Sequence, residues 1–150
     1  MKDFVIISEE DFQKARNKIR EAQKEGKTII FSGSDEINRK VLEKEKINVL
    51  LIKLSGRKDR IKQRNSGFNQ VLAKLAQKKA VIIGIDLKEF INSNKKEKSR
   101  ILARLEQNIE ICKKNKLNMI FINNEYSGDI YNLKSLGLVL GMPTWMTSQL

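Results

Sequence analysis

The sequence predicts an α/β fold with a mostly parallel sheet, in one domain over residues 1–150. Five short apolar runs recur along the chain, and nearly continuous apolar runs are typical of strands buried on both faces of such a sheet. Amphipathic helical segments lie between the runs, so strand and helix alternate. This alternation fits an open doubly wound sheet and a shortened barrel equally well, because both join parallel strands by right-handed crossovers.

The expected strands are short and rich in β-branched or aromatic residues. They are Phe4–Ile7, Thr28–Phe31, Asn48–Ile52, Ala80–Ile85 and Asn118–Ile122. In either architecture, the loops that follow the carboxyl ends of the strands form the ligand-binding edge.

The first two expected helices have clear boundary signals. Ser8 is expected to cap the first helix, with Asp11 in the acidic position of a capping box, and Gly26 ends it. Ser34 is expected to cap the second helix, which covers Asp35–Glu45.

Three more helices are expected in the second half of the chain. The third covers Gly67–Gln77, where apolar residues recur with helical spacing, and its cap is expected to be Ser66 or Asn65. The remaining two are expected at Lys96–Lys116 and Ile130–Leu140.

The composition removes several classes of active site. The chain has no histidine, so Ser-His-Asp and Cys-His sites and histidine metal ligation are excluded. No acidic cluster of the metal-binding type occurs either. We therefore expect no catalytic residue in this chain and no metal or cofactor bound by it. Cys112 is expected to be a buried small hydrophobe in a protein of the reducing cytoplasm. No membrane span or secretory signal is expected.

The positive charge is confined to the middle of the chain. Residues 51–116 contain 18 of the 30 Lys and Arg residues but only 6 of the 18 acidic ones, whereas the flanking parts nearly balance. The net charge of +12 therefore arises in this region. Charge concentrated in this way indicates a polyanionic partner. Nucleic acid is favoured over a membrane, because an interfacial helix with aromatic anchors is missing.

The most basic segment is Gly56–Gly67, "GRKDRIKQRNSG", called the basic loop below. It follows the third expected strand and leads into a helix N-terminus, whose unpaired N–H groups favour an anion. Guanidinium and ammonium groups suit phosphate oxygens. We expect RNA contacts from Arg57, Lys58, Arg60, Lys62, Arg64 and Asn65. The alternative is a solvated loop without a partner.

Three arginines outside the basic loop are further candidates for RNA contact. Arg100 and Arg104 are four residues apart on the long helix, where the alternative is a solvent-facing stripe. Arg39 lies on the second helix, where pairing with Asp35 or Glu36 explains it equally well. Aromatic residues are few, so recognition is expected to depend on the RNA backbone and shape rather than on base stacking.

Six motifs in order resemble protein component 3 of archaeal ribonuclease P. They are "EINRKVLEKEKINVLL", "GRKD", "NSGFNQVLAKLA", "VIIGIDLKEFI", "RILARLEQNIEICKK" and "IYNLKSLGLVLGM", within about Ser34–Ser148. The resemblance implies a barrel-like fold related to the TIM barrel, shortened or incomplete, with five to seven mostly parallel strands surrounded by helices.

The resemblance also implies a function and partners. It implies an RNA-binding subunit of the ribonuclease P holoenzyme, an endoribonuclease that removes the 5′ leader of precursor tRNA with Mg²⁺ held by the catalytic RNA. Its implied partners are that RNA, protein component 2 in a heterotetramer of two copies each, and the other ribonuclease P proteins. The alternatives are a general structured-RNA-binding module and, less favoured, a small barrel enzyme acting on a phosphorylated metabolite.

Two departures from the family pattern bear on these expectations. The segment "RIKQRN" (Arg60–Asn65) reads as an insertion, so Arg57 and Lys58 are expected to contribute most to RNA contact. The chain ends at "GMPTWMTSQL", so the barrel is expected to be incomplete or closed by another subunit. The apolar segment Leu136–Met146 is a candidate contact for component 2, or else a cap on the barrel core.

Overall fold

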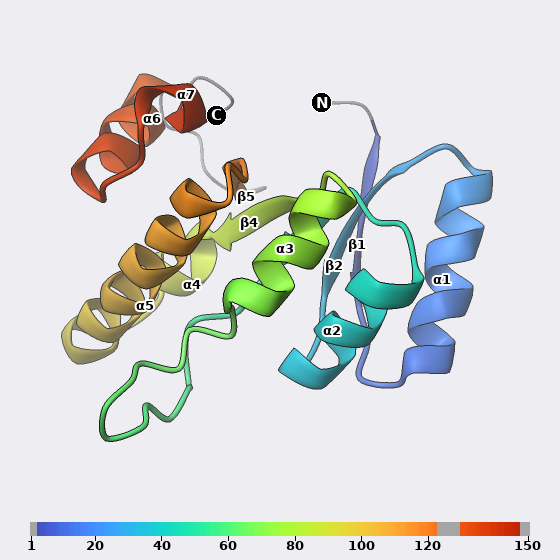
Figure 1. The fold of residues 1–150 in the computed structure, drawn as a ribbon, viewed down its shortest axis with the longest axis horizontal. Coiled ribbons are helices and arrows are strands. Elements are labelled where there is room, and N and C mark those ends of the chain that lie inside the picture. The colour runs from blue at the N-terminus through green and yellow to red at the C-terminus, as the bar shows by residue number, and fades with distance from the viewer. Residues whose placement is uncertain (1–2, 123–129, 148–150) are drawn as a thin grey trace.

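The computed structural model describes residues 3–122 and 130–147, which form a five-stranded parallel sheet with helices packed against it (Figure 1). Strands and helices alternate through most of the chain. In chain order the elements are β1 (Phe4–Ser8), α1 (Phe12–Lys24), β2 (Thr28–Ser32), α2 (Asp35–Lys44), β3 (Val49–Leu51), α3 (Gln70–Lys78), β4 (Ile82–Asp86), α4 (Leu87–Ile91), α5 (Lys95–Lys114), β5 (Met119–Ile122), α6 (Ile130–Val139) and α7 (Thr144–Thr147).

The strand order decides between the two architectures. The strands are hydrogen-bonded in the order β1-β2-β3-β4-β5, so each strand pairs with the next one along the chain. A doubly wound sheet reverses its order at a switch point, and the described strands show no reversal. Parallel strands in sequential order, joined by right-handed crossovers, carry their helices on one side, as a barrel does. The barrel-like prediction is confirmed, and the doubly wound alternative is wrong.

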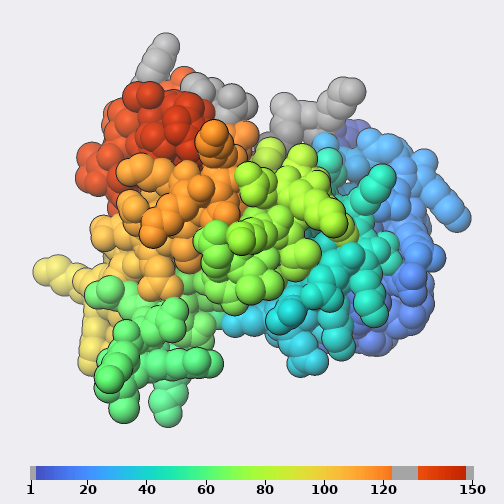
Figure 2. All heavy atoms as spheres, viewed as in Figure 1, coloured from blue at the N-terminus to red at the C-terminus, as the bar shows by residue number. Residues whose placement is uncertain are grey.

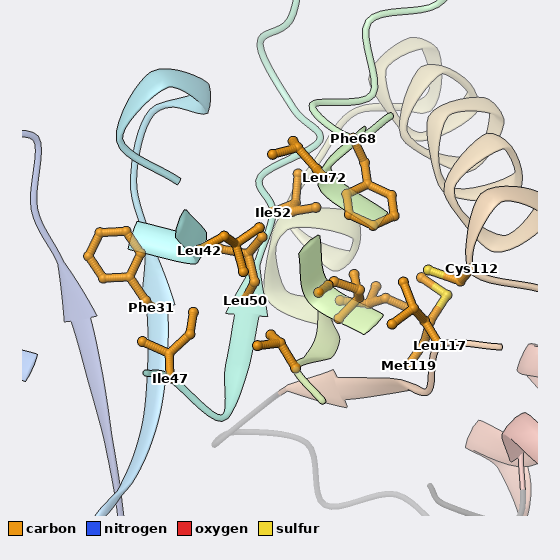
Figure 3. Packing of buried hydrophobic residues seen from close by; sticks show 14 of the residues in the cluster. Phe31, Leu42, Ile47, Leu50, Ile52, Phe68, Leu72, Cys112, Leu117 and Met119 are labelled. Atoms are coloured by element: carbon orange, nitrogen blue, oxygen red, sulfur yellow. The ribbon is translucent and has the colours of Figure 1, made fainter. Parts of the chain in front are cut away.

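Successive side chains of a strand point to opposite faces of the sheet, and the two faces have different neighbours. One set packs with residues of α1, α2, α3 and α5 in the main core, part of which is drawn in Figure 3. Its strand residues include Ile7, Phe31, Leu50 and Ile83. The other set forms a smaller apolar cluster of Ile30, Val49, Leu51 and Ile122. In a barrel-like sheet this second face is the interior one.

Most predicted elements are confirmed. All five strands lie within two residues of their expected bounds, as do the ends of α2, α5 and α6. The cap of α2 is confirmed as well, because the Ser34 hydroxyl accepts a hydrogen bond from the Ile37 N–H at 3.4 Å. Cys112 is fully buried, and burial raises the pKa of its thiol to about 12, so it behaves as the expected small hydrophobe.

The expected cap of the first helix is wrong. Ser8 is the last residue of β1, where it lies opposite Ser32 in the parallel register. The cap of α1 is Asp11, whose carboxylate accepts a hydrogen bond from the Gln13 N–H at 3.2 Å. Pairing with β2 carries the extended backbone one residue beyond the apolar run, so the helix starts later.

The expected cap of the third helix is also wrong. The helix begins at Gln70, and the Asn69 side chain accepts a hydrogen bond from the Leu72 N–H at 2.9 Å. Phe68 has helical spacing in the sequence, but it is buried in the main core from a position in the loop (Figure 3). The short helices α4 and α7 were not predicted. None of the helices in the described part of the chain is long and apolar enough to cross a membrane.

Candidate nucleic-acid interface

The basic loop lies at the carboxyl edge of the sheet, between β3 and α3. It projects beyond the body of the molecule as the long green loop at the lower edge of Figure 1, and it forms a protrusion in Figure 2. This is the edge at which parallel α/β folds bind ligands. The loop is therefore where the sequence predicts a binding surface.

Two carboxylates of neighbouring helices hold the start of this loop. Glu89 of α4 accepts hydrogen bonds from the N–H groups of Leu54 at 2.9 Å and of Ser55 at 2.6 Å. Glu97 of α5 accepts one from the N–H of Gly56 at 3.0 Å. The backbone that enters the loop is therefore bound to the helix layer before the first cation occurs.

Arg104 of α5 anchors the loop from inside. Its side chain is only 1% exposed. The guanidinium donates to the carbonyls of Leu54 and Arg57, both at 2.7 Å, and to the Asp59 carboxylate at 3.2 Å, and it lies 3.5 Å from Glu97. The sequence suggested Arg104 as an RNA contact, but the structure gives it a different role, because its hydrogen-bonding groups are used within the protein.

Asp59 closes the loop on itself. Its carboxylate accepts a hydrogen bond from the Asn65 N–H at 2.8 Å and a second one from Arg104. These two interactions, in that order, lower the pKa of Asp59 below its ordinary value. The single acid in the basic loop therefore stabilises the loop's shape.

Arg57 fastens the loop to α2. Its guanidinium donates two hydrogen bonds to the Asp35 carboxylate, each at 2.8 Å, and a third to the Asn65 side chain at 3.2 Å. Only 13% of its side chain is exposed. Gly67 is needed beside it, because its backbone has a φ of +71° and a Cβ there would meet the guanidinium. The structure therefore gives Arg57 a fastening role that differs from the direct RNA contact expected from the sequence.

Four cations remain exposed on the loop. In the described part of the chain they form no ion pair with a carboxylate, and they are Lys58, Arg60, Lys62 and Arg64. Backbone hydrogen bonds between Arg60 and Gln63, at 2.9 and 3.4 Å, close a tight turn at the tip. The segment that reads as an insertion thus carries three of the four exposed charges.

The other candidate residues differ in their surroundings. Arg100 is half exposed and lies 3.6 Å from Glu97, one turn away from the buried Arg104. Arg39 pairs with Glu43 at 3.0 Å, so a pairing within the helix is present, although with a different acid from the two expected. Asn65 is partly buried inside the loop.

A groove of about 520 Å³ separates the loop from the helices. It lies between the loop, the N-terminal ends of α2 and α3, and Gln107 of α5. Its lining residues are Asp35, Glu36, Arg39, Arg60, Gln63, Arg64, Asn65, Ser66, Gly67, Phe68, Asn69, Val71, Leu72 and Gln107.

The residues that shape this site are mostly ones that the sequence did not indicate. Glu89 and Glu97 read as ordinary helix acids, and Gln107 reads as a surface amide. Gln107 donates hydrogen bonds to the Arg64 carbonyl at 3.3 Å and to the Ser66 hydroxyl at 3.1 Å. These contacts join segments about forty positions apart, and no local pattern reports them. Over the described ranges, no group of three or more acids or cysteines comes together as metal ligands would.

The fold and the loop together define an incomplete parallel α/β barrel that presents a firmly anchored cationic loop at the carboxyl edge of its strands. Curated proteins named ribonuclease P protein component 3 match this chain. The protein from Methanosarcina acetivorans is 31% identical over 99 residues, which are 66% of this chain and 38% of that protein. The protein from Methanocaldococcus jannaschii is 30% identical over 111 residues, which are 73% of this chain and 45% of that protein.

The chain is thus a relative of archaeal ribonuclease P protein component 3, and the resemblance seen in its motifs is confirmed. It spans less than half the length of these curated relatives. A chain in a cryo-EM structure of archaeal ribonuclease P with mature tRNA has the same fold, with a TM-score of 0.76 and 24% identity over 95% of this chain and 61% of that one. No family model matches the sequence.

Proposed function

We propose that this chain is an RNA-binding subunit of ribonuclease P that supports the catalytic RNA in removing the 5′ leader of precursor tRNA. The observation that carries the proposal is the set of four exposed loop cations that form no close ion pair within the described residues, on a loop whose base is held by hydrogen bonds to Glu97 and from Arg104. The names of the sequence relatives support it. In this proposal the RNA holds the Mg²⁺ and performs the cleavage, and the chain contributes binding.

The anchoring of the loop supports RNA binding physically. Clustered cations repel one another, and a mobile loop would lose conformational entropy when it orders on a ligand. Arg57 and Arg104 hold the loop backbone in place. Binding by Lys58, Arg60, Lys62 and Arg64 therefore costs side-chain entropy but little further ordering of the anchored backbone. We therefore assign phosphate contact to these four residues, and the shape of the loop to the two anchoring arginines.

The test is RNA affinity measured across a salt series, with an archaeal ribonuclease P RNA transcript as the probe. Changing the four exposed loop cations to glutamine should weaken binding and reduce the salt slope by about two to four units, since each phosphate contact contributes about 0.7 to 0.9 of a unit. The matched control changes four exposed lysines outside the loop, Lys14, Lys24, Lys46 and Lys116, which removes the same charge. Equal losses in both variants would contradict a role specific to the loop.

We further propose that the chain associates with protein component 2, in two copies of each, and with other ribonuclease P proteins. Helices α6 and α7 present exposed apolar side chains that suit such a contact: Leu138 is 49%, Val139 84% and Trp145 41% exposed. Met146, from the same segment, is buried in the main core. Size-exclusion chromatography with light scattering on the mixed proteins tests the association. Two unshifted peaks at micromolar concentration would contradict it, and replacing Val139 with Asp should weaken it.

A further inference from the structure

The groove between the basic loop and the helices has walls of different chemistry. Its volume of about 520 Å³ is within the range of small-molecule sites. One wall is the loop, with the exposed Arg60 and Arg64. The opposite wall is formed by the N-terminal turns of α2 and α3. The helix wall also carries the charged residues Asp35, Glu36 and Arg39, which pair with Arg57, Lys40 and Glu43 respectively. A ligand that fills the groove therefore meets exposed cations on one side and a mixture of apolar, polar and ion-paired groups on the other.

The helix wall offers an apolar surface. Val71 is 53% exposed although it lies on a helix whose other apolar residues are mostly covered. Phe68 and Leu72 lie beside it in the lining and are each 5% exposed. A planar ring placed against Val71 would cover this apolar surface, which a phosphate or a sugar alone would not.

Polar groups around this surface suit the edge of a base. The side-chain oxygen Oδ1 of Asn69 accepts the capping hydrogen bond from the Leu72 N–H. The side-chain NH₂ of Asn69 remains available as a donor. The Gln63 side chain has no hydrogen-bond partner in the described part of the chain, and its amide can both donate and accept. Glu36 is 80% exposed and its Oε1 lies 3.6 Å from the Lys40 ammonium of the same helix. Its carboxylate has further acceptor capacity for an amino group of a base.

We propose that this groove holds one unpaired nucleotide of the bound RNA, with its base against Val71 and its phosphate at Arg60 and Arg64. The inference rests on the proposed RNA-binding function and names the element recognised. A base in an A-form helix has its pairing edge occupied, and its major groove is too narrow for side chains, so sequence-specific recognition by proteins uses splayed, unpaired bases. The carboxylate of Glu36 would face the base and not the phosphate, which avoids repulsion between anions.

The test compares two RNA hairpins that differ only by a single bulged nucleotide, in competition binding at one salt concentration. The wild-type chain should bind the bulged hairpin about tenfold more tightly, a difference of about 1.4 kcal/mol, because only the bulge offers an unpaired base to Val71 and the side-chain amides. The variant Q63A/V71S should bind both hairpins equally, with its salt slope unchanged because the cations remain. The matched control I91S changes an apolar side chain of α4 that is 51% exposed, and it should retain the preference.

The outcomes separate this inference from the proposed function. If the wild-type chain binds both hairpins equally well, the groove site is overturned and the RNA-binding proposal stands. If the wild type prefers the bulge and Q63A/V71S, folded by circular dichroism, keeps the full preference, the nucleotide lies elsewhere and the assignment of the groove is overturned. If the wild type binds neither hairpin nor the ribonuclease P RNA transcript, the proposed function itself fails.

Discussion

Arg100 and Arg104 lie one helical turn apart on α5, and the structure uses them in different ways. By sequence they form one stripe of equivalent cations. In the structure Arg104 is 1% exposed and bound to two carbonyls and two carboxylates, whereas Arg100 is half exposed beside Glu97. The spacing of the two arginines indicates that they share one face of the helix. The position of the basic loop then determines which of them is covered.

This difference predicts unequal effects of the same substitution. Arg104→Met should lower the free energy of unfolding by about 2–4 kcal/mol, because it leaves buried carbonyls and partly buried carboxylates without their donor. Arg100→Met should cost under about 0.5 kcal/mol, as exposed ion pairs usually do. Chemical denaturation of both variants checks this. Equal costs would mean that Arg104 does not anchor the loop.

Asp59 predicts a pH dependence of loop stability. Its pKa is lowered in the folded chain by the Asn65 N–H and by Arg104. A carboxylate whose pKa is lowered by folding stabilises the folded chain. This stabilisation is fully present when the pH is above the pKa of the unfolded chain, which is about 4, and it is lost as the pH falls through the pKa of the folded chain. The stability difference between the wild type and Asp59→Asn should therefore be largest near neutral pH and disappear in acid. If the stability difference between the wild type and Asp59→Asn grew as the pH fell, the ionised Asp59 carboxylate would not be the form that stabilises the loop.

At the scale of elements, the start of α3 is determined by tertiary packing as well as by local pattern. The apolar periodicity begins at Phe68, but the helix begins two residues later, because Phe68 enters the core from the loop and Gly67 adopts a left-handed backbone. The residue that then lies at the cap position is Asn69, and its side chain also lines the groove.

Removal of the Asn69 cap should cause a moderate loss of stability, and a serine at the same position provides the control. Asn69→Ala should lower the free energy of unfolding by about 1 kcal/mol, because the Leu72 N–H loses its acceptor, while Asn69→Ser retains an acceptor and should cost much less. Thermal or chemical denaturation of the two variants measures this difference. An alanine variant as stable as the serine variant would show that the Asn69 side chain does not stabilise the helix end.

At the scale of the whole molecule, the two faces of the sheet have different surroundings. The helix layer covers one face, and the other face is the interior side of an incomplete barrel. The first strand shows the contrast in adjacent residues: Ile7 is 4% exposed within the main core, and Ile6 is 41% exposed.

The same substitution at these two neighbours should therefore have effects of different size. Ile7→Ala should lower the free energy of unfolding by about 2–5 kcal/mol, because it removes buried volume from the main core. Ile6→Ala should cost about 1 kcal/mol or less, since much of its side chain is already in contact with solvent. Urea denaturation of both variants would measure the two costs. A large cost at Ile6 would show that the interior face is covered in solution.

The sequence by itself determined the strands, most of the helix boundaries and the location of the basic loop, because apolar periodicity and caps such as Ser34 act over a few residues. It also indicated the relatives of the chain through motifs such as "GRKD". Only the tertiary structure decided the strand order, and with it the choice of barrel over doubly wound sheet. It also decided which loop cations are anchors and which are exposed. Arg57 and Lys58 are adjacent and both basic, yet only Arg57 meets Asp35. That contact joins residues 22 positions apart, so it exists only once α2 and the loop have packed together.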